Sequence, residues 1–405
     1  MSFETPSPAL VDKVAEWLMD QALTERDLEA VVMGCCERLQ AAGLPLVRAF
    51  FAFSVLHPLH AAIGITWMRG TGTTMRGYPH VPGGRSEAYL HSPFAYMDER
   101  GLDLMHISLI GADNDYAFPI LAELKEQGLT DYLVFRITFD ERRDVGMYGS
   151  WATDRATGFS EPQLDALLRI QRRLAVASKM AVKSELMRNL AETYLGKDAG
   201  LRVLNGQIQR GDGQSIEAAI WYADLRSSTS MADTLPRQDY IETLNAFFDA
   251  TGGAVQNVGG QILSIIGDSL LAIFPTDAAA FPAETACAKA LEAALEAQRR
   301  LAKLNEQRRS LGRADLGYGI ALHFGEVMYG NVGMKERLTF SAFGSAVNQV
   351  VRLQQLTKDC GEPILASEFF ISKAIASDWR GVGEYALRGV GQPMRVVAPI
   401  AATGL

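Results

Sequence analysis

The sequence predicts a mixed α/β (α+β) protein built from three consecutive parts. From Ser215 onward, short apolar runs alternate with long amphipathic segments in the order of a ferredoxin-like βαββαβ unit. Residues 161–204 carry apolar side chains at helical spacing, whereas the part before them mixes helical and alternating patterns. We therefore expect domains at 1–160 and 214–405, joined by a helical connector and a Gly-rich linker at 161–213.

Length, composition and charge limit the class of protein. The chain has 405 residues, 48% hydrophobic and 21% charged, which is typical of a globular protein of two or three domains. The net charge of −8 argues against nucleic acid as a general partner. The four cysteines indicate neither a zinc site nor a disulfide framework. With no signal-peptide pattern and no stretch near ~18 uninterrupted apolar residues, we expect a cytoplasmic protein without a membrane helix.

The first part of the chain reads as a small sensor domain. Helical spacing indicates two helices in residues 8–44, and residues 69–100, polar and with five glycines, are expected to form a long loop. Strand patterns and one further helix occupy 46–55, 61–68, 104–109, 119–127 (the helix), 133–139 and 146–152. This order resembles the GAF or PAS class of sensor domains. The resemblance implies regulation by an unknown small-molecule or protein effector.

Five of the six histidines lie in this first part, which raises the question of a metal or haem site. Their spacing matches no ligand motif, and histidines in strands and loops commonly serve as hydrogen-bonded structure. Both interpretations stay open for these residues: His57, His60, His80, His91 and His106.

The connector reads as a long helix from Ser160 to about Leu204. Such a helix between two domains suits a dimeric coiled coil or bundle. Its heptads are imperfect, so packing against its own domain is the alternative.

Two carboxylates end short apolar runs in the last part. Asp224 follows the run 219–223, and Asp268 follows 262–266 and a glycine. Strand ends and hairpin turns can place two such hard oxygen ligands side by side. A pair of Mg²⁺ ions about 3.5–4 Å apart can then hold a phosphate between attacking and leaving oxygens.

The motifs around these carboxylates resemble the class III nucleotidyl cyclase family. Asp224-Leu225-Arg226-Ser227-Ser228-Thr229 is similar to its first metal motif, and Gly267-Asp268 to its second. The stretch 337–353 resembles its Asn-x-x-x-Arg segment, and Leu387-Arg388-Gly389 its last phosphate motif. Four short motifs in the family's order are far more specific than any one of them.

The resemblance implies attack of a ribose 3′-hydroxyl on the α-phosphate, with release of pyrophosphate. Asp224, Asp268 and the Leu225 carbonyl would hold two Mg²⁺ or Mn²⁺ ions per active site. The substrate phosphates would meet four further residues: Ser227, Ser228, Thr229 and Arg388.

Asn348 and Arg352 lie four residues apart, so they share one face of a helix. By resemblance, Asn348 orients the ribose and Arg352 stabilises the pentavalent α-phosphate, for which a guanidinium fork is well shaped. In the family this pair comes from the partner subunit. A homodimer with composite active sites is therefore implied, with no role for nucleic acid or membrane.

The base-reading positions depart from the adenylyl pattern. The usual Lys is Ser264, and the second position is Thr339, which one subgroup of bacterial adenylyl cyclases shares. Hydroxyl groups donate or accept, so they serve adenine or a pyrimidine equally. ATP is the expected substrate, with a pyrimidine nucleotide or GTP as the alternative. A different class of function is a catalytically weak, nucleotide-sensing dimerisation module.

Overall fold

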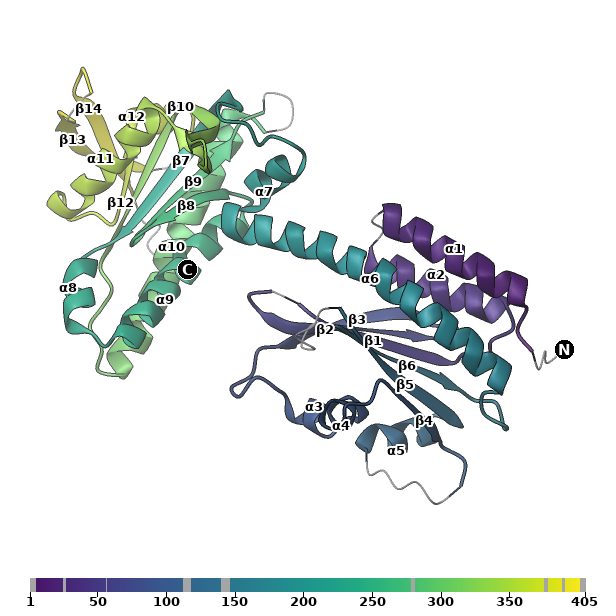
Figure 1. The fold of residues 1–405 in the computed structure, drawn as a ribbon. Coiled ribbons are helices and arrows are strands. Elements are labelled where there is room, and N and C mark those ends of the chain that lie inside the picture. The colour runs from purple at the N-terminus through teal and green to yellow at the C-terminus, as the bar shows by residue number, and fades with distance from the viewer. Residues whose placement is uncertain are drawn as a thin grey trace. The chain divides into compact units, whose positions relative to one another are not determined.

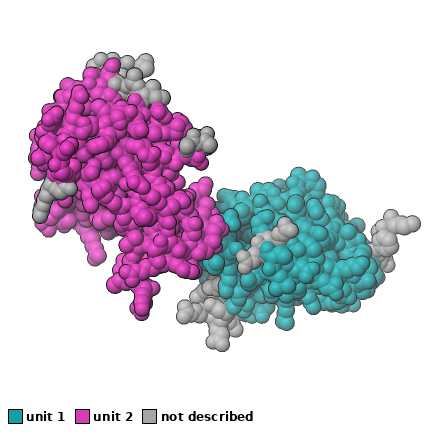
Figure 2. Space-filling model, turned by 90° about the horizontal axis from the view of Figure 1, so that it is seen from above, with its two compact units in different colours: residues 1–190 teal, residues 191–405 magenta. Residues whose placement is uncertain are grey.

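The computed structural model describes residues 5–24, 27–55, 57–111, 118–139, 146–277, 281–374, 378–387 and 390–400. The chain forms two compact units, residues 1–190 and 191–405, which Figure 2 shows in different colours. Each unit has a β-sheet of its own (Figure 1). Among the described helices, none combines the length and the apolar character needed to cross a membrane.

Unit 1 is built on a six-stranded antiparallel sheet in the order β3-β2-β1-β6-β5-β4. Its strands are β1 (Arg48–Ser54), β2 (His60–Met68), β3 (Gly72–Pro79), β4 (Leu104–Ser108), β5 (Asp131–Thr138) and β6 (Gly146–Thr153). Its helices are α1 (Pro8–Thr24), α2 (Leu28–Ala41), α3 (Glu87–Leu90), α4 (Pro93–Arg100), α5 (Pro119–Glu126) and α6 (Glu161–Leu195), the last of which ends in unit 2.

Helices cover both faces of this sheet (Figure 1). Residues of α1, α2 and α6 share one apolar core with Leu133 and Phe135 of β5. Residues of α4 and α5 share another core with Tyr132 and Val134 of the same strand. Successive strand residues point to opposite faces, so β5 is buried on both sides.

The expectation of a long loop at 69–100 was wrong, because β3, α3 and α4 lie there. Strand β3 pairs only with β2 and is largely polar, so it lacks an apolar alternation. Both helices begin at a serine that caps them: Ser86 accepts from Tyr89 N–H, and Ser92 accepts from Ala95 N–H.

Unit 2 is built on an eight-stranded sheet, in which β13-β14-β12-β10-β7-β9-β8 form a path and β11 pairs with β10. Its strands are β7 (Gly213–Leu225), β8 (Gln261–Ile266), β9 (Ser269–Pro275), β10 (Tyr318–Met334), β11 (Arg337–Phe343), β12 (Ile364–Ser367), β13 (Trp379–Tyr385) and β14 (Met394–Pro399). Its helices are α7 (Lys197–Leu204), α8 (Ser228–Thr234), α9 (Arg237–Asn257), α10 (Ala283–Ser310), α11 (Ser345–Asp359) and α12 (Glu368–Ile371).

The central strand β7 is buried from both sides. Ala219, Trp221 and Ala223 pack with α9 and α10, whereas Ala218 and Ile220 pack with α11. The element order from β7 to β10 is the expected βαββαβ alternation, with the short helix α8 added before α9. The predicted α+β class of this domain is confirmed.

The connector is not one uninterrupted helix to Leu204. Helix α6 ends at Leu195, and α7 begins after Gly196, whose φ is 86°. A side chain at Gly196 would be strained, because its Cβ would also lie 2.7 Å from the Ile262 carbonyl oxygen of β8. The close approach to β8 explains why glycine separates the two helices.

Candidate active site

Two carboxylates meet where β7 ends. Asp224 lies in register with Ser269, the first residue of β9, and Asp268 occupies the turn that precedes it. The Leu225 N–H donates to the Asp268 carbonyl, with 3.2 Å between nitrogen and oxygen. A strand end and a hairpin turn thus place the two aspartates side by side.

A serine hydroxyl holds each carboxylate. Ser269 Oγ donates to Asp224 Oδ1 at 2.7 Å, and Ser228, the first residue of α8, donates to Asp268 Oδ2. All four side chains are only partly buried, so the carboxylates are fixed yet accessible.

The electrostatics of the pair suit a cation. Burial raises the pKa of Asp224, the Ser269 hydrogen bond opposes this, and the charge of Asp268 raises that pKa further. A divalent ion would relieve the repulsion, and carboxylates are the hard oxygen ligands that Mg²⁺ prefers. In the described part of the chain, no cluster of three or more His, Cys, Asp or Glu side chains offers a richer metal site.

The segment after β7 is held in an uncommon conformation. Ser227 has φ 63°, the one positive φ of a non-glycine residue among the described residues. Next to it, the Arg226 guanidinium donates to the carbonyls of Thr357, at 2.8 Å, and Glu362, at 3.4 Å. These contacts hold the turn that brings Ser228 to Asp268, while Ser227 and Thr229 stay exposed.

Asn348 and Arg352 lie on α11, on the face turned away from the sheet. The helix buries a different stripe: Ala346, Val350, Leu353, Gln354 and Thr357. Asn348 is exposed and Arg352 is half-buried, so this segment is less buried than its apolar residues suggested. Within the described residues, Arg352 has no recorded ion pair.

Asn348 and the aspartate pair are also separated along the length of the sheet. A Cβ on Gly325 would touch Ala346 at the start of α11, whereas a Cβ on Gly319 would clash with Thr357 near its end. Gly319 pairs with Asp224 in β7, and Gly325 pairs with Ala218. Six strand residues span about 20 Å. One chain therefore does not bring Asn348 to Asp224.

The base-reading candidates occupy neighbouring strands. Ser264 lies on β8, where its Oγ is buried and has no hydrogen-bond partner among the described residues. Thr339 is exposed on β11, which contacts β8. Arg388 lies outside the residues that the structure describes.

The histidines of unit 1 have local partners. His57 and His60 stack with 4.8 Å between ring centroids, and His80 Nε2 lies 2.9 Å from the His57 carbonyl. His91 contacts its own helix, and His106 Nε2 lies 2.8 Å from the Asp131 carboxylate. These contacts support hydrogen-bonded structural roles for four of the five side chains, whereas His60 Nδ1 is buried without a hydrogen-bond partner among the described residues.

Comparison with known proteins gives unit 2 its family. The model of the adenylate and guanylate cyclase catalytic domain family matches residues 213–391. These residues are a class III cyclase catalytic domain. The predicted family is confirmed, and Asp224, Asp268, Asn348 and Arg352 all lie inside the match.

Relatives of the cyclase domain cover part of this chain. An adenylate cyclase of Anabaena cylindrica is 32% identical over 165 residues, 40% of this chain and 31% of that protein. An uncharacterized protein of Mycobacterium tuberculosis is 29% identical over 218 residues, 53% of this chain and 38% of that protein. The matches thus span well under half of the length of these relatives.

Solved cyclase structures match about half of this chain. The adenylyl cyclase CyaB of P. aeruginosa is 21% identical, with a TM-score of 0.43, and the match covers 47% of this chain and 96% of that one. The guanylyl cyclase Cya2 is 24% identical, with a TM-score of 0.41, and the match covers 48% of this chain and 98% of that one.

The sequence reasoning did not single out Ser269 in the cyclase domain. Its position directly after Gly267-Asp268 was visible in the sequence. Its role as the hydrogen-bond donor to Asp224 follows only from the pairing register of β7 with β9.

Proposed function

We propose that this chain is a nucleotidyl cyclase that converts a nucleoside triphosphate to the 3′,5′-cyclic nucleotide and pyrophosphate. ATP is the expected substrate. The observation that carries the proposal is the juxtaposition of Asp224 and Asp268 at the end of β7, each held by a serine, inside a cyclase domain. A strand end with two accessible carboxylates suits the binding of metal-bound triphosphate.

The donor set at this strand end fits divalent ions. Asp224, Asp268 and the Leu225 carbonyl would hold two Mg²⁺ or Mn²⁺. Such ions supply activation of the 3′-hydroxyl and neutralisation of the triphosphate charge. The residues of this chain provide the fixed geometry: Ser269 orients Asp224, and Ser228 orients Asp268. The exposed hydroxyls of Ser227 and Thr229 are available to phosphate oxygens.

The remaining catalytic groups come from a second copy of the chain in this proposal. Asn348 and Arg352 face away from their own sheet, and Asn348 lies far from Asp224, so in this proposal the pair serves the carboxylates of a partner. Asn348 would hold the ribose, and Arg352 would bind the α-phosphate with its guanidinium fork.

Exposed apolar side chains support a homodimer with two composite sites. They belong to β8 and to the part of β10 that pairs with β11: Ile265, Ile266, Met328, Val332 and Met334, each at least 45% exposed. Exposed apolar side chains of this size are candidates for contact with a partner.

Base selectivity is expected to be weaker than in cyclases with a lysine at the Ser264 position. The loss of a charged donor removes a hydrogen bond worth about 1.5–3 kcal/mol. The buried Ser264 hydroxyl, without a protein partner in the described structure, is a candidate contact for a base, and Thr339 is the second. This pair suits ATP, and it also accommodates GTP or a pyrimidine nucleotide.

A panel of ATP, GTP, CTP and UTP with Mg²⁺ or Mn²⁺ tests the proposal by pyrophosphate release and identification of the cyclic product. We expect turnover, fastest with ATP. If only a nucleotide other than ATP is turned over, that nucleotide replaces ATP as the proposed substrate. Binding of nucleotide without turnover of any of the four would favour a nucleotide-sensing dimerisation module. Unit 1 would be the regulatory domain in either case.

A further inference from the structure

A pocket of about 530 Å³ is lined entirely by residues of unit 1. Its walls come from the start of β4, the end of β5 and one side of α6. These three elements belong to one compact unit, so the pocket is a feature of this unit alone.

Part of the pocket lining is apolar and incompletely covered. Leu104 of β4 is 40% exposed and Val176 of α6 is 44% exposed, although both are large aliphatic residues. Ile137 and Phe139 extend the same lining from the end of β5. A ligand with a hydrocarbon or aromatic body would remove this surface from water.

The charged groups around the lining have a positive excess. Arg172 and Lys179 lie two turns apart on α6, and neither has a recorded ion pair within the described residues. Lys179 Nζ lies 4.8 Å from the centroid of the Phe139 ring, at the apolar lining itself. An anionic group on the ligand would find two cations that have no carboxylate partner among the described residues.

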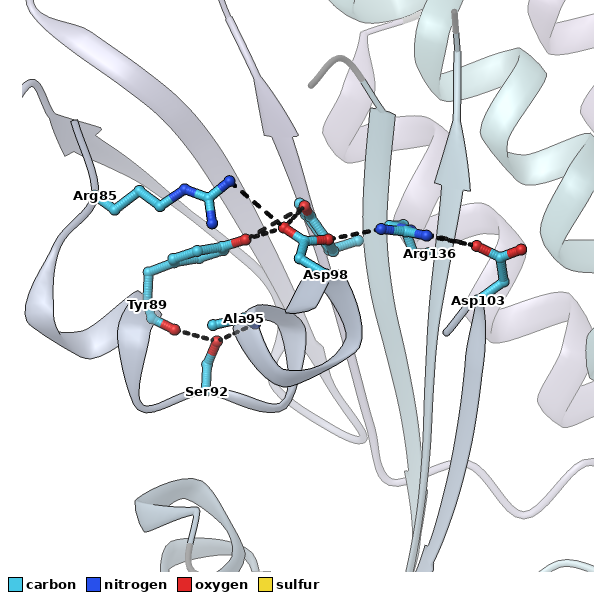
Figure 3. A network of polar contacts seen from close by, with 8 residues as sticks. Arg85, Tyr89, Ser92, Ala95, Asp98, Asp103 and Arg136 are labelled. Carbon is cyan, nitrogen blue, oxygen red and sulfur yellow. Dashed lines mark hydrogen bonds and ion pairs between the residues drawn. The ribbon is translucent and has the colours of Figure 1, made fainter. Parts of the chain in front are cut away.

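The one carboxylate in the lining is paired with an arginine. Arg136 donates to Asp103 at 2.9 Å and to Asp98 at 2.8 Å, as Figure 3 shows. Tyr89 and Tyr148 also donate to Asp98, so Arg136 is anchored in a network that leaves Asp103 paired (Figure 3). The Arg136 charge, which Asp103 shares with Asp98, offsets part of the repulsion between Asp103 and an anion.

A polar acceptor completes the lining. Gln171 Oε1 is buried and has no hydrogen-bond partner among the described residues. A buried acceptor of this kind is costly unless a ligand or water supplies a donor. Apolar side chains and two cations define the chemical class of the ligand, and a hydroxyl or N–H group on that ligand would satisfy Gln171.

We propose that this pocket binds a small organic anion with an apolar body, such as an aromatic carboxylate. Helix α6, which forms one wall, runs on to Leu195, beyond the limit of unit 1. The pocket is thereby a candidate effector site, and only that regulatory role rests on the proposed cyclase function. The proposal that the pocket binds such an anion does not depend on cyclase turnover.

The full chain is titrated with 8-anilinonaphthalene-1-sulfonate, an aromatic anion whose fluorescence rises in apolar sites. We expect saturable binding of one probe per chain, displaced by cinnamate and not by benzyltrimethylammonium of similar size. Arg172→Glu should weaken binding at least tenfold. Arg173→Glu is the matched control, because Arg173 is the next exposed arginine of the same helix and does not line the pocket.

Circular dichroism and a thermal melt verify that both variants fold. Equal affinity of the Arg172→Glu and Arg173→Glu chains would overturn the proposal, as would equal displacement by the cation. A second variant, Val176→Trp, should fill the pocket and lower the number of bound probes to near zero. If the chain binds the probe but turns over no nucleotide, the pocket proposal stands and only the cyclase proposal is rejected. Where turnover is present, saturating probe should change the rate in the parent and leave the Arg172→Glu rate unchanged.

Discussion

Ser269 Oγ lies 2.7 Å from Asp224 Oδ1 and donates a hydrogen bond to it across the pairing of β7 with β9. The contact fixes one oxygen of the carboxylate and leaves the other for a ligand. Side chains that orient metal-binding groups in this way commonly change metal affinity or activity 10–100-fold when removed. Ser269 is therefore a positioning residue in the proposed mechanism.

Replacement of this hydroxyl gives the first prediction. Ser269→Ala should raise the Mg²⁺ concentration for half-maximal turnover roughly tenfold. The free energy of unfolding should fall by only about 1 kcal/mol, the usual contribution of one hydrogen bond. Turnover is measured over a Mg²⁺ series, with Ser269→Thr as the control that keeps the hydroxyl. An unchanged Mg²⁺ dependence in Ser269→Ala would show that the serine does not position Asp224.

Mixing experiments address the composite site. Asp224→Ala and Arg352→Ala chains should each be inactive, whereas a 1:1 mixture should recover about a quarter of the parent activity. This value follows because half of randomly formed dimers are mixed and each mixed dimer has one intact site. The matched control mixes Asp224→Ala with Asp268→Ala, which damages the same half of every site and should recover nothing. Mixed dimers without activity would refute the division of the site between copies.

The fold could be predicted where local pattern and final environment agree. β7 is an apolar run because both of its faces are covered, and the hairpin at 261–274 is set by apolar runs on both sides of Gly267. β3 was not predicted because it is a polar strand whose described pairing is with β2 alone. The signals of the two helices after it were short: a serine cap before each, with Pro93 and Gly101 bounding the second.

The sequence predicted which residue types form the candidate site, but not how their side chains are arranged. Asp224 lies at the end of a strand and Asp268 in a hairpin turn, and their sequence context indicates both positions. The partnership of Ser269 with Asp224 depends on strand register, which the sequence leaves open. Likewise, the outward face of Asn348 follows from the side of α11 that packs on the sheet.

Base selectivity provides a third test. Ser264→Lys would place a charged donor where the Ser264 hydroxyl is buried without a described protein partner. We expect the preference for ATP over the other nucleotides to rise by about 10-fold or more, because a hydrogen bond to a charged group contributes roughly 1.5–3 kcal/mol. The ratio kcat/KM is compared for all four nucleotides. Ser264→Met, similar in length and without charge, is the control. An identical preference profile in Ser264→Lys would show that this position does not contact the base.

The acid sensitivity of unit 2 should depend on His323. Its Nδ1 lies 2.8 Å from Ser367 Oγ in the core, and burial lowers the pKa of His323 to about 4. Between pH about 6.5 and 4, His323 is protonated in the unfolded chain and neutral in the folded chain. The free energy of unfolding should therefore fall by about 1.4 kcal/mol per pH unit, or about 3 kcal/mol in total by pH 4. Above pH about 6.5 this contribution is constant. Denaturant unfolding between pH 4.5 and 7.5 should therefore give a shallower slope for His323→Gln than for the parent, whereas His91→Gln, an exposed control, should retain the parent slope. Parallel slopes for the parent and His323→Gln would exclude this histidine as the source of acid lability.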